Sequence, residues 1–476
     1  MNSPSANPAT TTEARLSISR FGGWGGGRGE GAEVIAALVC ALLLFVSVDA
    51  QAGVFDIFGF GSRNVAMGGT GTASADDHTA AFYNPAALTR RKVVHLGMSF
   101  TAYFSQLSID THGAAAAGLT PSKASSPAGI SFGVLFPVGG KIERRVALGL
   151  GLYIPFAHAL ALEALEPSVP RWYRYNTLED KLHIVAAVGF ELTDWVSIGI
   201  GIQSLADLEG ELSFQVDLSN EAIHRRDAKV ELINTASPTV GFLFTLLRGS
   251  EPRARGWTLG ATYRGPVELA YTFPLRFDFG DAFDLTLNIS GIDLYTPHTL
   301  AFGTAYEFGS PALTIALDAT VGLWSLAPDP SLQVTVLGTG DLVDGLGLDD
   351  YLNMLPGANP PAGFRDTVNL AVGVEHRPLD WLTLRAGYAW KQAVLAEQTQ
   401  ASSYLDSDAH CVSAGVAFTA PDPLEMNDRP VILDLTGNAT FHPNADVTKA
   451  DPNAPIHQLT FGGQIWGLAI SVRHDF

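Results

Sequence analysis

The amino-acid sequence predicts an all-β fold, a transmembrane antiparallel β-barrel of about 14 strands whose lumen is plugged by an N-terminal hatch. Three observations predict it. Apolar residues alternate with small or polar ones along most of the chain, short and long connections take turns between the alternating segments, and the last segment ends on an aromatic residue. A soluble β-sandwich alternates as well, so the other two observations decide between the two fold classes.

The alternation is clear in 145–155, where large aliphatic residues share one face and Gly149 and Gly151 lie on the other. Segments 366–376 and 381–391 repeat it on either side of the turn-forming stretch HRPLDW. Successive side chains of a strand point to opposite faces of the sheet. Each segment therefore presents one apolar face and one small or polar face.

The connections differ systematically in length. Short ones such as ELTDW alternate with long ones, which we expect to be irregular, at 206–233 and 279–296 among others. Outer-membrane barrels show this difference between their two ends, together with girdles of aromatic residues near the strand ends. The tryptophans in such positions are Trp195, Trp257, Trp381, Trp390 and Trp466. The chain closes with QIWGLAISVRHDF, an alternating strand whose final Phe476 resembles the signal read by the outer-membrane assembly machinery.

Fourteen segments of the sequence fit a strand. This even count places both termini on the periplasmic side. They are 93–105, 129–138, 145–155, 181–191, 195–205, 234–246, 256–278, 297–308, 311–323, 366–376, 381–391, 410–419, 430–442 and 458–476. The stretch YRGPV inside 256–278 could be a tight turn. We interpret 256–278 as one long strand that projects above the bilayer, because this keeps the count even.

The chain divides into three parts. Residues 1–51 are a long leader with a signal peptide that we expect to be removed, because the apolar run Val34–Val48 is shorter than the about 20 residues of a spanning helix. Residues 52–92 are rich in glycine and fit neither a strand nor a long helix, and 93–476 hold the strands. A fourteen-stranded lumen is too wide to be filled by wall side chains alone. We therefore expect 52–92 to be a hatch folded inside the barrel.

The hatch region also carries a family resemblance. Its stretch SRNVAMGGTGTASADDHTAAFYNPAAL resembles the N-terminal hatch of the FadL family of outer-membrane transporters for long-chain fatty acids and hydrocarbons, and Asn84, Pro85 and Ala86 match the family's Asn-Pro-Ala motif. The resemblance continues in RDTVNLAVGVEHRPLDWLTLRAGYAW and SDAHCVSAGVAF, so it covers most of the chain. It implies a fourteen-stranded barrel with a hatch.

Composition excludes several other classes. The net charge of −19 argues against a nucleic-acid partner. Of the two cysteines, Cys40 lies in the leader and leaves Cys411 alone, which excludes a disulfide framework. The sequence suggests no cofactor.

Two groups of polar residues could be taken for metal sites. Around Asp76, Asp77 and His78 a third ligand at suitable spacing is missing, and a solvated turn or polar contacts between hatch and wall explain these residues better. Asp408 and His410 are similarly sparse. We therefore predict no metal.

The candidate ligand-binding residues lie in two places. Phe55, Phe58 and Phe60 could line an apolar pocket for an alkyl chain, or merely pack the hatch against the wall. Further along, Arg171, Trp172 and Arg174 could capture an amphiphile at the cell surface, with the carboxylate on arginine. The alternative for this second group is an aromatic and basic rim that contacts lipopolysaccharide.

The expected function is passive uptake of hydrophobic molecules, long-chain fatty acids or aromatic hydrocarbons, across the bacterial outer membrane. The expected partners are the hydrophobic ligand, outer-membrane lipids and, during biogenesis, the barrel-assembly machinery. Two alternatives remain at this point. The first is a barrel enzyme of the lipase or phospholipase kind, although no GxSxG motif is present. The second is a general porin for polar solutes, which would conduct ions freely.

Overall fold

The computed structural model describes residues 54–112, 119–139, 145–156, 168–176, 182–217, 222–246, 256–278, 284–309, 312–331, 333–339, 362–423, 425 and 427–476. The predicted leader, 1–51, lies outside them. Within the described ranges, no helix has both the length and the apolar character to cross a membrane.

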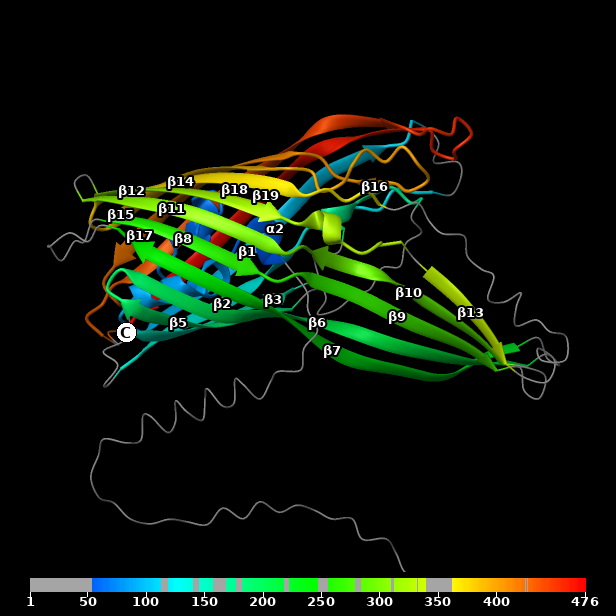
Figure 1. The fold of residues 1–476 in the computed structure, drawn as a ribbon, viewed down its shortest axis with the longest axis horizontal. Helices are drawn as coiled ribbons and strands as arrows, with labels where there is room; N and C mark the ends of the chain where they lie inside the picture. The colour runs from blue at the N-terminus through cyan, green and yellow to red at the C-terminus, as the bar shows by residue number, and fades with distance from the viewer. Residues whose placement is uncertain are drawn as a thin grey trace, which may run out of the picture. The chain divides into compact units, whose positions relative to one another are not determined.

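Fourteen antiparallel strands form a closed barrel (Figure 1). They are β1 (His95–Asp110), β2 (Ala128–Val138), β3 (Val146–Pro155), β5 (His183–Thr193), β6 (Val196–Asp217), β7 (Ala222–Thr245), β8 (Trp257–Arg264), β11 (Thr299–Gly309), β12 (Ala312–Gly322), β14 (Thr367–Leu379), β15 (Leu382–Lys391), β17 (Ala409–Ala420), β18 (Val431–Thr448) and β19 (Gln458–Asp475). Strand β1 closes the ring, because it pairs with β2 and with β19, so that Phe100 is opposite both Ile130 and Ile470. The predicted fold class and strand number are confirmed.

The expectation of one continuous strand over 256–278 is wrong. Strand β8 ends at Arg264, where it is still paired with β7 and β11, and a new strand, β9 (Val267–Asp278), starts after Gly265 and Pro266. Proline has no backbone N–H to continue a ladder. The backbone N–H of Gly265 instead donates to the carbonyl of Pro238 at 2.8 Å, which turns the chain out of the wall.

Several strands extend beyond the wall at the barrel end that carries the long connections (Figure 1). Strand β9 pairs with β10 (Asp284–Thr296) and runs parallel to the far part of β6, and β10 pairs with β13 (Gln333–Thr339). The expected irregular loops at 206–233 and 279–296 are therefore largely strand: β6 and β7 stay paired out to Asp217 and Ala222. Two-residue strands β4 (Arg171–Trp172) and β16 (Tyr404–Leu405) pair with each other.

The two faces of the wall differ as the alternation predicts. Large apolar side chains on the outside are exposed, which suits contact with lipid. Examples are Met98, Phe104, Ile154, Trp466 and Leu468. Small and polar side chains point inward, where many are buried, such as Ser99, Ser131 and Thr436. What buries them is the N-terminal segment.

This segment, Val54–Lys92, is built from short helices joined by turns. They are α2 (Val54–Phe58), α3 (Ser62–Ala66), α4 (Ala80–Tyr83) and the 3-10 helix η1 (Pro85–Arg90). Helix α3 lies against β15, β17 and β18, while η1 lies against β3, β5, β6 and β7. The helices, coloured blue in Figure 1, are thus surrounded by strands from both halves of the barrel. Two further 3-10 helices, η4 (Tyr173–Tyr175) and η5 (Trp324–Leu326), lie in the long connections.

Candidate functional site in the barrel lumen

The turn before η1 attaches the N-terminal segment to the wall through one amide side chain. Asn84 Nδ2 donates to the carbonyl of Thr72 at 2.7 Å, within the segment, and to the carbonyl of Phe242 at 2.9 Å, on β7. Its Oδ1 accepts from the backbone N–H of Ala86 at 3.1 Å, which caps η1, and Pro85 follows as the first residue of that helix. Asn84 is fully buried. The Asn-Pro-Ala stretch therefore holds the segment to the barrel.

Glycines on the inner wall make room for this close approach. A Cβ added at Gly241 would lie 2.1 Å from Asn84 Oδ1, and one at Gly199 would lie 2.3 Å from the carbonyl carbon of Pro85. Real Cβ atoms do not come so close to another heavy atom, so any larger residue at these positions would push the segment away. The small face of the alternating strands is the docking surface of the N-terminal segment.

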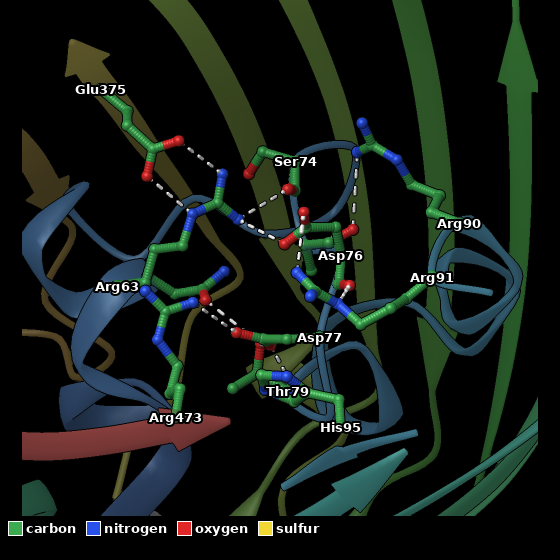
Figure 2. A network of polar contacts seen from close by, with 12 residues as sticks. Arg63, Ser74, Asp76, Asp77, Thr79, Arg90, Arg91, His95, Glu375 and Arg473 are labelled. Atoms are coloured by element: carbon green, nitrogen blue, oxygen red, sulfur yellow. Dashed lines mark hydrogen bonds and ion pairs between the residues drawn. The ribbon is translucent and has the colours of Figure 1, made fainter. Parts of the chain in front are cut away.

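A charged network joins the other side of the segment to the wall (Figure 2). Arg63 of α3 donates to Glu375 of β14 at 2.8 Å, and Arg385 of β15 bridges Glu375 and Asp434, both at 2.6 Å. Arg473 of β19 donates to Asp434 at 2.7 Å and lies 3.5 Å from Asp77 of the segment. Cations and carboxylates alternate along this chain of contacts, so each buried charge has an opposite neighbour.

The segment's own acids are held ionised by the same network. Burial alone would raise the pKa of Asp76, but Arg63 and Arg91 outweigh it and hold that pKa below its ordinary value. Arg63 lies 3.1 Å from Asp76, and Arg91 lies 3.3 Å from it and 2.6 Å from Asp475 at the end of β19. Asp76 thus stays a carboxylate and keeps two arginines in place. These contacts lie at the barrel end that holds the short connections.

Toward the other barrel end, the predicted phenylalanines enter an aromatic cluster. Phe55 stacks on Phe60 with ring centres 4.1 Å apart, and Phe58 stacks on Tyr103 of β1 at 3.8 Å. His183 of β5 lies on Phe55 at 4.4 Å. All three phenylalanines are buried, with Phe60 fully enclosed behind Phe55.

The second predicted group divides. Trp172 is buried in the same apolar cluster as the phenylalanines and contacts Phe461 with ring centres 5.4 Å apart. The Arg171 guanidinium lies over the Tyr404 ring, 4.7 Å from its centre. Arg174 is buried and donates to Asp406 at 2.9 Å.

Two neighbouring cavities lie between this aromatic cluster and the long connections. One of about 120 Å³ is lined in part by Phe55, Phe58 and Phe82, and the other, of about 90 Å³, in part by Arg174 and Trp324. Both are bordered by a shared group of residues from α2 and the wall: Asp56, Ile57, Arg264, Thr320, Asn369 and Lys391. Because they share these residues, the two cavities are adjacent, and together they are called the internal space.

Sequence patterns did not single out the charged residues of this space. Arg264 lies over the Phe82 ring, 4.7 Å from its centre, and 3.8 Å from Asp56. Lys391 Nζ donates to the carbonyl of Ile57 at 2.5 Å. Both cations are the last residues of their strands, β8 and β15, and both occupy inward positions. A charge at the end of an alternating strand on the small face is the signal that could have found them.

The comparisons with known proteins agree with this architecture. A family model described as "Outer membrane protein transport protein (OMPP1/FadL/TodX)" matches residues 356–476. A solved structure titled "CymD monoaromatic hydrocarbon channel" is similar at 16% sequence identity and a TM-score of 0.51, covering 89% of this chain and 99% of that one. The toluene transporter TodX of P. putida is similar at 15% identity and a TM-score of 0.51, covering 88% and 99%.

A Pseudomonas aeruginosa FadL homologue is similar at 15% identity and a TM-score of 0.50, covering 90% of this chain and 98% of that one. At such identities the likeness to solved structures is one of fold. The comparison with curated proteins gives no match.

Proposed function

We propose that this chain is an outer-membrane channel for hydrophobic molecules, of the kind described by the OMPP1/FadL/TodX family model that matches residues 356–476, and that its substrates pass when the N-terminal segment moves. The segment Val54–Lys92 acts as a hatch that closes the lumen. Passage is passive and runs from the long connections, on the cell surface, toward the hatch.

The observation that carries this proposal is the size of the internal space. Its two parts measure about 120 and 90 Å³. A cavity of about 150 Å³ is known to hold one benzene molecule. Each part is smaller than that, so a single aromatic ring needs the lining to shift, and a whole fatty acid needs the hatch to withdraw. The closed lumen also argues against a general porin.

The lining of the space points to amphiphilic substrates. Phe55 and Phe58 supply apolar surface, and Phe60 supports Phe55 from behind. Arg264 and Lys391 place two cations at the border of the same space. Burying an alkyl chain contributes about 0.8 kcal/mol per CH₂, and a carboxylate forms charge-assisted hydrogen bonds with such cations. We infer a hydrophobic acid, a fatty acid or an aromatic acid, as the preferred ligand.

Capture takes place beside the long connections. Arg171 and Trp172 form strand β4 there, against Tyr404 and Leu405 of β16. Trp172 and Tyr404 are buried in this structure, so they receive the apolar part of the ligand when β4 and β16 move apart, and Arg171 then supplies a cation. Arg174 is already paired with Asp406, so it takes part once a ligand carboxylate replaces Asp406.

Two further partners belong to this proposal. Outer-membrane lipids contact the apolar outer face, whose exposed side chains include Phe132 and Phe302. The barrel-assembly machinery engages the last strand, where Phe476 ends the chain with its backbone N–H on the carbonyl of Val94 at 2.8 Å.

A reversible cross-link tests whether the hatch must move. The hydroxyls of Ser62, on α3, and Ser99, on β1, are 3.3 Å apart. The double variant Ser62→Cys/Ser99→Cys, made with Cys411→Ser, can join hatch and wall by a disulfide. Uptake of a radiolabelled fatty acid by cells should fall to background when the variant is oxidised and recover when it is reduced. Unchanged uptake by the oxidised variant would show that passage does not need this movement.

A pair of ligands tests the proposed substrate class. Lys391→Met keeps the length of the side chain and removes its charge. It should weaken binding of a fatty acid to the purified protein about tenfold, which corresponds to about 1.4 kcal/mol, and leave the methyl ester of the same acid unaffected. Lys123→Met, at an exposed position, is the matched control. Equal binding of the acid by Lys391→Met and by the control would show that Lys391 does not recognise a ligand carboxylate.

A further inference from the structure

The fold adds a third side chain to the acid and histidine pair that precede the Asn-Pro-Ala stretch. Asp77 and His78 lie in the hatch, and His95 is the first residue of β1. One ligand atom from each of the three lies within 4.8 Å of the other two. All three residues are more than nine-tenths buried.

The two imidazoles carry nitrogens that the protein does not use. Among the described residues, His78 Nδ1 and His95 Nε2 have no hydrogen-bond partner, although both atoms are buried. Buried polar atoms without a partner are uncommon and call for an explanation. Here two such atoms lie on neighbouring rings, which stack with centres 5.4 Å apart.

The surroundings of His95 prepare it for one role in particular. Its Nδ1 lies 2.7 Å from Asp475 Oδ1. In the tautomer that carries its proton on Nδ1, His95 donates a hydrogen bond from Nδ1 to Asp475. Its free lone pair then lies on Nε2, the atom without a partner. A histidine that binds a metal almost always donates its other ring N–H in this way, often to a carboxylate.

The His78 ring lies in a slot between two wall glycines, and a larger residue at either glycine would fill the slot. It lies against Gly97 of β1 and Gly133 of β2, which are opposite each other in the sheet. A Cβ at Gly97 would lie 2.2 Å from the ring, and one at Gly133 would lie 2.0 Å from it. The wall therefore fixes the position of this imidazole beside that of His95.

From this geometry we infer that Asp77, His78 and His95 form a binding site for a divalent transition-metal ion of the zinc type, which ties the hatch to the first strand. Two imidazoles and one carboxylate, with a fourth position left for water, are a donor set that zinc accepts. Bonds of about 2.0 Å in a tetrahedron place ligand atoms about 3.3 Å apart. Because the wall fixes His78, binding requires the Asp77 and His95 side chains to close on it from the present separation of up to 4.8 Å.

Three arginines surround the site, and each is paired with a carboxylate outside it. They are Arg473, 3.5 Å from Asp77 Oδ2, Arg91 and Arg63, the last paired with Glu375. Arg473 is already held by Asp434, and Arg91 by Asp475. One oxygen of Asp77 accepts from Thr79, with the backbone N–H at 2.9 Å. A bound ion replaces the contact with Arg473 and leaves that arginine with Asp434.

The inference is tested on the detergent-purified full chain, prepared without a histidine tag, treated with chelator and titrated with Zn²⁺ in a calorimeter. The wild type should bind one Zn²⁺ per chain. His78→Gln and His95→Gln should each bind at least about tenfold more weakly, since loss of even a supporting residue around a metal typically costs that much. His457→Gln, far along the chain in another connection, is the matched control and should bind as the wild type does.

Absence of stoichiometric binding to the wild type would overturn the inference, and so would equal binding by all three variants. A second measurement uses only the wild type, so it does not depend on whether the variants fold. Co²⁺ added to the wild type should show the intense visible absorption of a four- or five-coordinate site with nitrogen ligands. A spectrum no different from that of aqueous Co²⁺ would contradict the site.

Discussion

Arg63 of the hatch and Glu375 of strand β14 are joined by two parallel hydrogen bonds, Nε to Oε2 at 2.8 Å and Nη2 to Oε1 at 3.1 Å. Paired bonds of this kind fix orientation as well as distance. Glu375 also accepts from Arg385, at 2.6 Å, so one wall carboxylate serves two arginines. The pair is the point at which the hatch connects to the charged network of the wall.

Glu375→Gln should loosen the hatch. The amide keeps the shape of the side chain but leaves Arg63 and Arg385 without their shared charge, and removing one member of a buried pair costs about 3–5 kcal/mol. Spontaneous opening events in planar bilayers should become at least tenfold more frequent. Glu397→Gln, at an exposed position, is the matched control. Opening frequencies that stay equal in the two variants would show that the network does not hold the hatch.

Gly241→Ala should displace the hatch from the opposite side. The new methyl group would lie 2.1 Å from Asn84 Oδ1, whose amide holds the segment to β7. Gly437→Ala is the control, because the nearest atom to its Cβ is 4.0 Å away. Thermal unfolding of the purified proteins should show a lower Tm for Gly241→Ala alone. The same Tm for both variants would mean that close packing at Gly241 does not matter.

Phe55→Ala and Phe58→Ala should weaken binding of a hydrophobic ligand about tenfold, because burial of one large apolar side chain is worth roughly 1.5–3 kcal/mol. Both residues line the internal space. Phe132→Ala, on the outer face, is the control and should bind normally. Fluorescence titration with a fatty acid measures this. Full binding by both hatch variants would leave the phenylalanines with packing alone.

Phe476→Asp should impair assembly, whereas Phe476→Tyr should not. The ring is partly exposed beside His474, with ring centres 4.5 Å apart, and an aspartate would place a charge at the membrane interface. The amount of heat-modifiable barrel in the outer membrane measures assembly. Equal amounts of the two variants would show that the terminal aromatic ring is not needed.

The barrel was predictable because its signal is local. Alternation depends on residues two positions apart, so fourteen wall strands followed from short stretches of sequence. The break at Gly265–Pro266 was visible too, but its meaning depended on β8 pairing with β11, which lies over thirty residues further on. The sequence predicts loops for the far parts of β6 and β7, because it is pairing between them, and not an apolar pattern, that makes them strands.

The candidate site divides in the same way. Phe55, Phe58 and Trp172 were found because aromatic residues near the hatch and in a long connection stand out in the sequence. The partners of Arg63 do not stand out in the sequence, because Glu375 is 312 positions away. The third member of the group around Asp77 and His78 escaped for the same reason, because His95 belongs to a different element and only the fold brings it close.

The ion conductance of a barrel without the hatch shows whether the hatch closes the lumen. Residues 54–92 are deleted, the strands from β1 onward are kept, and heat-modifiable migration confirms that the barrel has formed. Because side chains of the wall cannot fill a fourteen-stranded barrel, the deletion variant should show large, steady single-channel conductance in planar bilayers, whereas the full chain conducts little. Equally low conductance in both proteins would contradict the account and assign the closure to the long connections.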